Sequence, residues 1–177
     1  YENIALQNVR SNQHQIGVHV DASAVLTNLS LTDCQLNICG NGLLIEIGAV
    51  VNGLTITGGN MDGNNFGLSV AANNTADNSN ALKNVNITGT SFLNNTYFGL
   101  LFNAGQDIVL DGITVSGNGT ATPTAAGVYF TWRMGTYSNI TLRNSVITNN
   151  ATNPGITLGG GVLVRPRANA TVSGVLL

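Results

Sequence analysis

The feature that most constrains the fold is a short element, Gly-apolar-x-apolar, that recurs six times along 177 residues. The copies begin at Gly17, Gly42, Gly67, Gly99, Gly127 and Gly161, at spacings of 25 to 34 residues. An apolar-x-apolar element precedes each copy, and a seventh begins near Ala170. Alternation at period two is typical of strands with one buried face. Repeats of this length built from strands and turns predict a solenoid of stacked coils.

The composition agrees with strands and turns. Asn (26 residues) and Gly (22 residues) together exceed a quarter of the chain, and Val, Ile and Thr favour strands. Charged residues make up 8%, against about 25% in an ordinary domain. The net charge of −2 gives no basis for nucleic-acid binding. No apolar run approaches the roughly 20 residues of a membrane span, and no signal-peptide pattern follows Tyr1.

The combined pattern of an Asn-apolar-x-apolar strand, an Asn turn and the Gly strand resembles right-handed parallel β-helix proteins of the pectin-lyase-like superfamily. The resemblance covers about Asn3 to Leu177. It implies one all-β domain over residues 1–177, a right-handed parallel β-helix (β-solenoid) of about six full coils plus the start of a seventh. It also implies a secreted, cell-surface or virion-associated protein, but no single activity, because the fold hosts many.

The ends of the chain look open, because a strand begins almost at residue 1 and the last three residues are apolar. We therefore expect a fragment of a longer β-helix, with its ends continued or covered by a partner subunit or a second copy.

Three sets of positions follow from the stacking. Two inward columns are expected, namely Val18, Leu43, Leu68, Leu100, Val128 and Val162, and Val20, Ile45, Val70, Phe102, Phe130 and Val164. Turn asparagines are expected either to form amide ladders or to adopt left-handed turn conformations: Asn12, Asn37, Asn64, Asn95, Asn118 and Asn149. Insertions are expected at Ala71–Leu82, Gly119–Ala126 and Ala151–Gly160. The repeat Gly indicates either a positive φ or a close backbone approach.

Few residues offer chemistry. Cys34 and Cys39 lack the neighbours of a zinc site, and either a disulfide or two buried thiols fits their spacing. His19, Asp21 and Glu46 would allow acid–base work or weak metal binding, but an exposed polar edge is favoured. We therefore predict no metal site and no cofactor.

Catalysis is not favoured. The eight acidic residues form no polygalacturonase-like, pectate-lyase-like or epimerase-like cluster, so no catalytic residue is assigned. If the chain were an enzyme, the resemblance implies a polysaccharide lyase or glycoside hydrolase. Outward hydroxyls such as those of Thr55 and Thr57 resemble an ice-binding array, but Val109, Asp111 and Arg143 interrupt it.

The outward side of the Gly strand is the predicted contact face. Its second position reads His19, Leu44, Ser69, Leu101, Tyr129 and Leu163. Exposed apolar stripes usually mark a partner surface, unless the inserted loops cover this one.

Charge is divided along the chain: residues 1–111 carry −6 and residues 112–177 carry +4. Arg133 and Arg167 both lie six residues after a repeat Gly, with Arg165 on the same side. Trp132 is either a core residue or part of the same surface. The predicted ligand-binding residues are Tyr129, Trp132, Arg133, Arg165 and Arg167.

We therefore predict a carbohydrate-facing module that binds an extended, acidic polysaccharide, as in tailspikes, adhesins or polysaccharide-processing proteins. The alternatives are a non-catalytic structural spine and, less favoured, an ice-binding solenoid.

Overall fold

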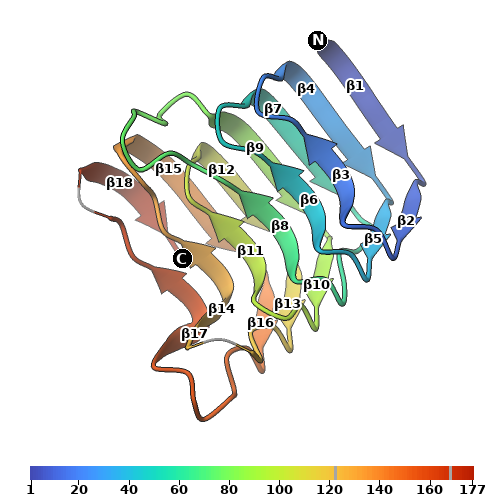
Figure 1. Ribbon diagram of the computed structural model, residues 1–177, viewed down its shortest axis with the longest axis vertical. Coiled ribbons are helices and arrows are strands. Elements are labelled where there is room, and N and C mark those ends of the chain that lie inside the picture. The colour runs from blue at the N-terminus through green and yellow to red at the C-terminus, as the bar shows by residue number, and fades with distance from the viewer. Residues whose placement is uncertain (122, 168) are drawn as a thin grey trace.

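The computed structural model describes residues 1–121, 123–167 and 169–177, and these form strands and turns without a helix. Every strand pair is parallel, and the strands form three sheets that run along the stack of coils (Figure 1). The sheet formed by the first strand of each coil has seven strands, and the sheet formed by the last strand of each coil has six. The expected parallel β-helix of six full coils plus the start of a seventh is therefore confirmed.

We call the three sheets A, B and C in the order in which the chain visits them. Sheet A contains β1 (Glu2–Gln7), β4 (Val25–Thr32), β7 (Val50–Thr57), β9 (Leu82–Thr88), β12 (Gln106–Asp111), β15 (Gly135–Arg143) and β18 (Ala170–Leu176). Sheet B contains β2 (Arg10–Asn12), β5 (Gln35–Asn37), β10 (Ser91–Leu93), β13 (Thr114–Ser116) and β16 (Val146–Thr148), with Asn60 bridging β5 and β10. Sheet C, the front layer of Figure 1, contains β3 (Ile16–Val20), β6 (Asn41–Ile45), β8 (Phe66–Val70), β11 (Phe98–Phe102), β14 (Thr124–Phe130) and β17 (Leu158–Val164).

Both expected core columns are confirmed residue by residue in the register of sheet C. Their middle members are fully buried, as for Leu68, Leu100 and Phe102 at 0% exposure. Only the first and last coils leave members partly exposed, as at Val164. The alternating pattern of the Gly strand therefore places one continuous aliphatic and aromatic core inside the coils.

The seventh coil is aligned differently from the prediction. β18 begins at Ala170 as expected, but Thr171 pairs with Thr136, and Val175 is the residue that pairs with Ile140. Gly174, at φ 63°, is the counterpart of Asn139, at φ 60°. The apolar-x-apolar pattern occurs twice within β18, and the left-handed residue decides which copy aligns.

Three columns of left-handed residues bend each coil in the same places, with φ between 51° and 89°. One column runs within sheet A (Asn3, Asn28, Gly53, Asn84, Asp107, Asn139, Gly174), and two stand at corners (Asn8, Asp33, Gly58, Gly89, Gly112, Asn144; and Gln13, Ile38, Gly63, Asn94, Gly117, Asn149). All but Gln13 and Ile38 are Asn, Asp or Gly, the residues that tolerate this conformation best. Asn149, for which either a ladder or a left-handed turn was expected, adopts the left-handed turn and belongs to a corner column.

A ladder of buried asparagine amides lies beside the last of these corners. The backbone N–H groups of Asn64, Asn95 and Asn118 donate to the side-chain Oδ1 of the next coil's Asn at 2.9, 2.9 and 3.0 Å. Asn150 is the final acceptor, and Cys39 stands where the preceding coil would have its Asn. The ladder is thus confirmed for three of the six expected residues.

The two cysteines form no disulfide: Cys34 and Cys39 are buried free thiols.

The repeat Gly is required by close approach. At Gly99, which lacks a positive φ, a Cβ atom would lie 2.8 Å from the carbonyl oxygen of Gly127 and 2.9 Å from Val115 Cγ1. The same contact with the next coil's glycine recurs from Gly17 to Gly127. Of the two explanations offered by the sequence, close backbone approach is therefore the correct one.

The insertions are shorter than expected because the flanking strands extend into them. Leu82 opens β9 and is fully buried. β14 begins at Thr124 and β17 at Leu158, so the later loops end before those residues. Thr122, inside the second predicted insertion, lies outside the described residues.

Replacing Gly99 with Val is expected to lower the free energy of unfolding by about 1–3 kcal/mol, because the side chain overpacks two fixed neighbours. The control is Gly155→Val, at a position where the nearest atom to a Cβ is 3.4 Å away. Chemical denaturation measures both, and an unchanged stability of Gly99→Val would contradict the close approach.

Replacing Asn118 with Ala is expected to destabilise the protein by about 1–3 kcal/mol, because buried donors of Asn95 lose their acceptor. The exposed Asn80→Ala is the matched control. Equal thermal stability of the two variants would show that the ladder contributes nothing.

Candidate functional site

An open groove lies on the outer face of sheet C, over β8, β11 and β14, with a volume of about 500 Å³. Its apolar lining comes from Phe66, Tyr97, Phe98, Leu101, Pro123 and Tyr129. Its polar lining comes from Asn103, Thr124, Thr131, Arg133 and Arg167. No carboxylate lines the groove among the described residues. Its volume falls within the usual range for small-ligand sites.

The floor of the groove is a second apolar cluster, separate from the core. Phe98, Ala126 and Tyr129 are buried in it, and Phe66 and Leu101 pack against them. The rings meet at tilts, with centroids 5.9 Å apart for Phe66–Phe98 and 5.2 Å for Phe98–Tyr129. Further along the predicted contact stripe, Leu44 and Leu163 stay half-buried. Leu101 is likewise half-buried, whereas Ser69 and Tyr129 are buried, so the stripe is exposed only in part and its role as a contact face stays a prediction.

Tyr129 has an unusual hydroxyl. The side chain is 3% exposed, and its hydroxyl has no hydrogen-bond partner among the described residues. Buried hydroxyls nearly always have a partner, because an unpaired one costs about 1–3 kcal/mol. Tyr129 lines the groove, but its hydroxyl oxygen is itself buried, so this atom is closed to a ligand in the present conformation.

Arg133 and Arg167 occupy neighbouring coils at one end of the groove. The pairing of Phe130 with Val164 continues to them, and the Arg167 backbone N–H donates to the Trp132 carbonyl at 2.9 Å. Arg167 Nε donates to Thr131 Oγ1 at 2.9 Å, and Arg133 donates to the side-chain oxygens of Asn103 and Asn74. These partners are neutral, and neither arginine forms an ion pair within the described part of the chain.

The other two predicted site residues lie elsewhere. Trp132 is 0% exposed, stacks between Phe130 and Tyr137 in the core, and donates its Nε1–H to the Gly105 carbonyl at 3.0 Å. Its ring therefore cannot contact a ligand, which corrects that part of the prediction. Arg165 is exposed and does not line the groove.

A loop from the third coil reaches the arginine end of the groove. Besides the Asn74–Arg133 hydrogen bond, the Asn78 backbone N–H and side-chain amide both donate to the Met134 carbonyl, at 2.9 and 3.1 Å. Ser79 Oγ accepts the Thr136 N–H at 2.8 Å and donates to Asp77. Those contacts from Ser79 hold the pKa of Asp77 below its usual range. The loop thus fixes the place of Arg133.

His19, Asp21 and Glu46 come together at the other end of the molecule. His19 Nε2 lies 2.9 Å from Glu46 Oε1, and the ligand atoms of all three lie within 4.8 Å of one another. The backbone N–H and hydroxyl of Ser23 donate to Asp21, which lowers its pKa. The side chains of His19 and Glu46 are 39% and 37% exposed. The three side chains form a polar cluster at the molecular edge, in which His19 contacts Glu46 directly. The geometry alone does not assign this cluster an acid–base or metal-binding role, so the favoured assignment as a polar edge stays a prediction.

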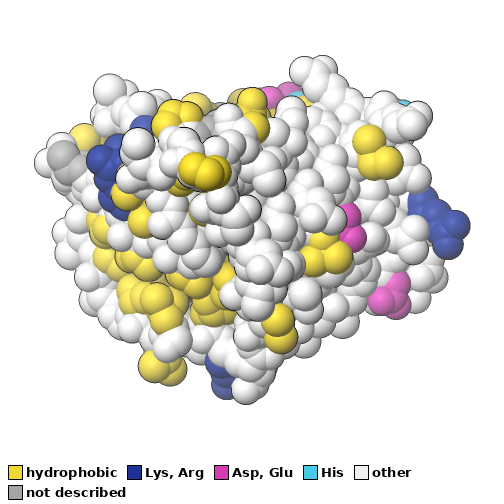
Figure 2. Space-filling model, turned by 90° about the horizontal axis from the view of Figure 1, so that it is seen from below, with side chains coloured by type: hydrophobic (Ala, Val, Ile, Leu, Met, Phe, Trp, Pro, Cys, Tyr) yellow, Lys and Arg dark blue, Asp and Glu magenta, His cyan; other side chains and the backbone are white. Residues whose placement is uncertain are grey.

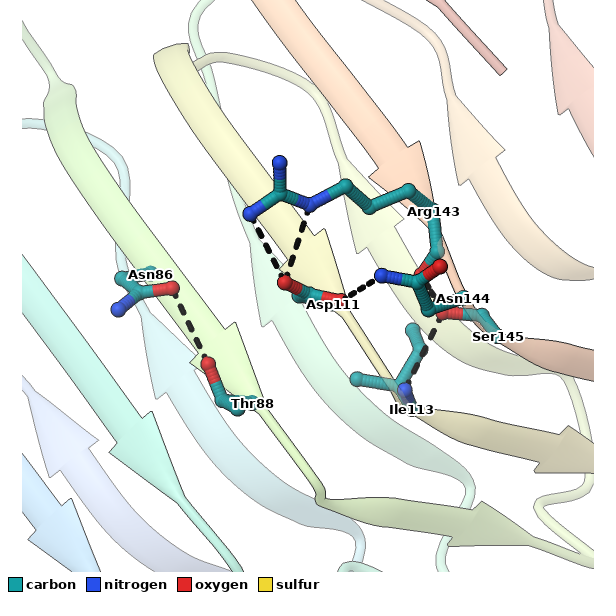
Figure 3. Close-up of polar contacts among 7 residues, drawn as sticks. All are labelled: Asn86, Thr88, Asp111, Ile113, Arg143, Asn144 and Ser145. Carbon is teal, nitrogen blue, oxygen red and sulfur yellow. Dashed lines mark hydrogen bonds and ion pairs between the residues drawn. The ribbon is translucent and has the colours of Figure 1, made fainter.

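The outer face of sheet A is occupied by structural contacts (Figure 3). Asp111 pairs with Arg143 at 2.9 Å and accepts from Asn144 Nδ2 at 2.9 Å, and these contacts, the Asn144 bond first, lower the pKa of Asp111. Asp107 accepts a hydrogen bond from Asn139 at 2.7 Å.

The outward hydroxyl array of sheet A is interrupted at Val109, which follows Ser30, Thr55 and Asn86 in register. The array is therefore interrupted where the sequence indicated.

A second hollow, of about 610 Å³, lies at the C-terminal end of the stack, where Leu142, Ile147, Val162, Leu176 and Leu177 line it together with Arg143 and its neighbours. Figure 2 shows apolar side chains gathered at this end and charged side chains widely separated across the visible face. Unlike the groove, this hollow contains no unpaired buried polar atom among the described residues.

Five lining residues were missed from the sequence: Phe66, Tyr97, Phe98, Asn103 and Thr131. Phe66 and Phe98 each directly precede a repeat Gly, and alternation across that Gly predicts that they point into the core. The signal was the repetition itself, because an aromatic residue precedes the repeat Gly in two consecutive coils.

Comparison with known proteins identifies the fold. The model of the family described as right handed beta helix region matches residues 76–176, more than half of the chain. No curated protein and no solved structure matches. Within the described residues, no helix has the length and hydropathy that a membrane crossing requires.

Replacing Tyr129 with Phe is expected to leave stability unchanged or raise it by about 1 kcal/mol, because the hydroxyl has no partner to lose. In the matched variant Tyr137→Phe, the lost hydrogen bond to the Met134 carbonyl is expected to lower stability by about 1 kcal/mol. Denaturant titration measures both. A marked loss of stability in Tyr129→Phe would contradict the unpaired hydroxyl.

Proposed function

Since the chain belongs to the family of right-handed β-helix regions, we propose that it is a non-catalytic module that binds an extended, acidic polysaccharide on the outer face of sheet C. The observation that carries the proposal is the pair of arginines, without carboxylate partners within the described part of the chain, at one end of a groove that no described carboxylate lines. The proposal includes a secreted, cell-surface or virion-associated location, where such polymers occur.

The charges support an anionic ligand. Arg133 and Arg167 stand in adjacent coils, about 4.8 Å apart along the stack, and their like charges repel unless an anion lies between or beside them. Their neutral partners orient Arg167 through Nε and Arg133 through Nε and Nη1, and leave other guanidinium N–H groups for a ligand. A guanidinium donates in a fork that fits a carboxylate or a sulfate.

The open shape of the groove supports a polymeric ligand. The groove is open, and the half-buried side chains of Leu44 and Leu163 continue the outward column of sheet C beyond it. A long ligand can therefore extend over the neighbouring coils.

The positions of the acidic residues support binding without catalysis. Glycoside hydrolysis requires a pair of carboxylates flanking the scissile bond, and no carboxylate among the described residues lines the groove. A pure spine is the main alternative, but it gives no reason for two arginines at one end of an apolar groove without carboxylate partners among the described residues.

The test is calorimetric titration with a uronic-acid polymer and with a neutral polymer of equal length. We expect binding of the acidic polymer only, an affinity that falls as salt rises, and at least a tenfold loss in the Arg133→Ala/Arg167→Ala double variant. Arg143→Ala, which removes an arginine already paired with Asp111, is the control and is expected to change affinity less than twofold. Binding that ignores salt and both arginines, or release of new reducing ends, would contradict the proposal.

A further inference from the structure

The residues that follow the strands of sheet C form one column whose charge changes sign along the stack. The column contains Asp21, Glu46, Ala71, Asn103, Thr131 and Arg165. From Glu46 to Arg165, each member donates its backbone N–H to a carbonyl of the preceding coil at 2.8 to 3.0 Å, so the register is continuous. Asp21 and Glu46 follow the strands of the first and second coils, whereas Arg165 follows that of the sixth.

The neighbouring positions carry the same division of charge. Arg133 and Arg167 lie two residues further along the chain than the column, in the fifth and sixth coils. Asp77, in the loop of the third coil, already accepts the backbone N–H and the hydroxyl of Ser79 at 2.8 and 2.5 Å. The strand ends of sheet C are therefore acidic at the first two coils and basic at the fifth and sixth.

A second copy of the chain complements this edge when the two copies lie face to face on sheet C, related by a two-fold axis parallel to the strands. Placed between the third and fourth coils, this axis exchanges the first coil with the sixth and the second with the fifth, and keeps strand ends opposite strand ends. Asp21 then lies opposite Arg165 of the second copy, and both groups are exposed. The contact occurs twice, because a two-fold interface is self-complementary.

A small hollow beside Glu46 fits an arginine from the second copy. Its lining is Leu44, Glu46, Ile47 and Ala71, and its volume is about 290 Å³. Arg133, in the fifth coil, is the cation that the two-fold axis brings opposite the second coil. An arginine side chain packs its aliphatic stem on apolar walls and directs its guanidinium to a carboxylate.

The same axis covers the apolar stripe of sheet C, over which no further layer of described strands lies (Figure 1). Leu44 faces Tyr129 of the second copy, and Leu101 faces its Ser69. Six coils of five-residue strands give a face of roughly 30 by 16 Å, or about 500 Å² per copy. This is at the lower limit for a specific interface, so we expect a weak dimer whose charges decide its orientation.

We propose that the outer face of sheet C is a two-fold interface between copies of this chain. Asp21 and Glu46 of each copy pair with Arg165 and Arg133 of the other. The dimer uses an arginine of the polysaccharide site, so an acidic polymer competes with the second copy; this consequence, unlike the dimer itself, rests on the proposed function.

The test is sedimentation velocity of the full chain over a range of protein concentrations, at low and high salt. We expect a monomer–dimer equilibrium whose dissociation constant rises at least tenfold with salt. Asp21→Arg and Arg165→Asp are each expected to weaken the dimer at least tenfold. The double variant, in which acid and base have exchanged places, is expected to recover to within threefold. Arg10→Asp, a change of equal charge at an exposed position of sheet B, is the control and is expected to alter dimerisation less than twofold.

Adding the uronic-acid polymer separates this inference from the proposed function, since the polymer is expected to release monomers. A monomer at every concentration would overturn the dimer and leave the polysaccharide function standing. A dimer that ignores salt and both single variants, or a double variant that does not recover, would overturn the assignment to this face. A confirmed dimer without any polymer binding would support the dimer and overturn the proposed function, and a polymer that binds without releasing monomers would overturn the competition.

Discussion

The structure depends on corners that turn in the same place in every coil. A parallel stack keeps its register only if each chain segment bends directly above the bend below it, and here the bends are left-handed residues at three positions per coil. Ordinary side chains avoid this conformation, so the requirement selects Asn, Asp and Gly. It accounts for the unusual share of Asn and Gly in the chain and for the seven-stranded continuity of sheet A.

Inside the corners, two further columns leave little freedom. The repeat glycines approach the next coil's carbonyl too closely for a Cβ, and the amides of Asn64, Asn95 and Asn118 run alongside them. Because backbone and buried amides fix the register, the outward positions of sheet C can vary. The third to sixth coils use that freedom for aromatic residues and arginines, which form the groove.

The sequence was sufficient to predict the positions that repeat from coil to coil. It was insufficient where the place of a side chain depends on neighbours that occur in one coil only. Val18 to Val162 and the six coils followed from the period of the Gly strand, which reports stacking directly. The sequence left the burial of Trp132 open. In the structure the ring is buried because the small side chain of Ala104 in the preceding coil leaves a space that the larger ring fills. The groove was only half predicted: its arginines follow from equivalent positions, whereas Phe66 and Phe98 turn outward where alternation breaks at the glycine.

The loop that carries Asn74, Asn78 and Ser79 gives the stack a property that most solenoids lack. In a simple solenoid each coil contacts only its neighbours, so stability is a chain of nearest-neighbour terms and the ends can fray one coil at a time. Here a loop of the third coil is hydrogen-bonded to Met134 and Thr136, beyond the fourth coil. The loop thereby joins the third, fourth and fifth coils and the start of the sixth into one cooperative block. Fraying that starts at the C-terminal coils would stop at this block, and the arginine end of the groove lies on its boundary.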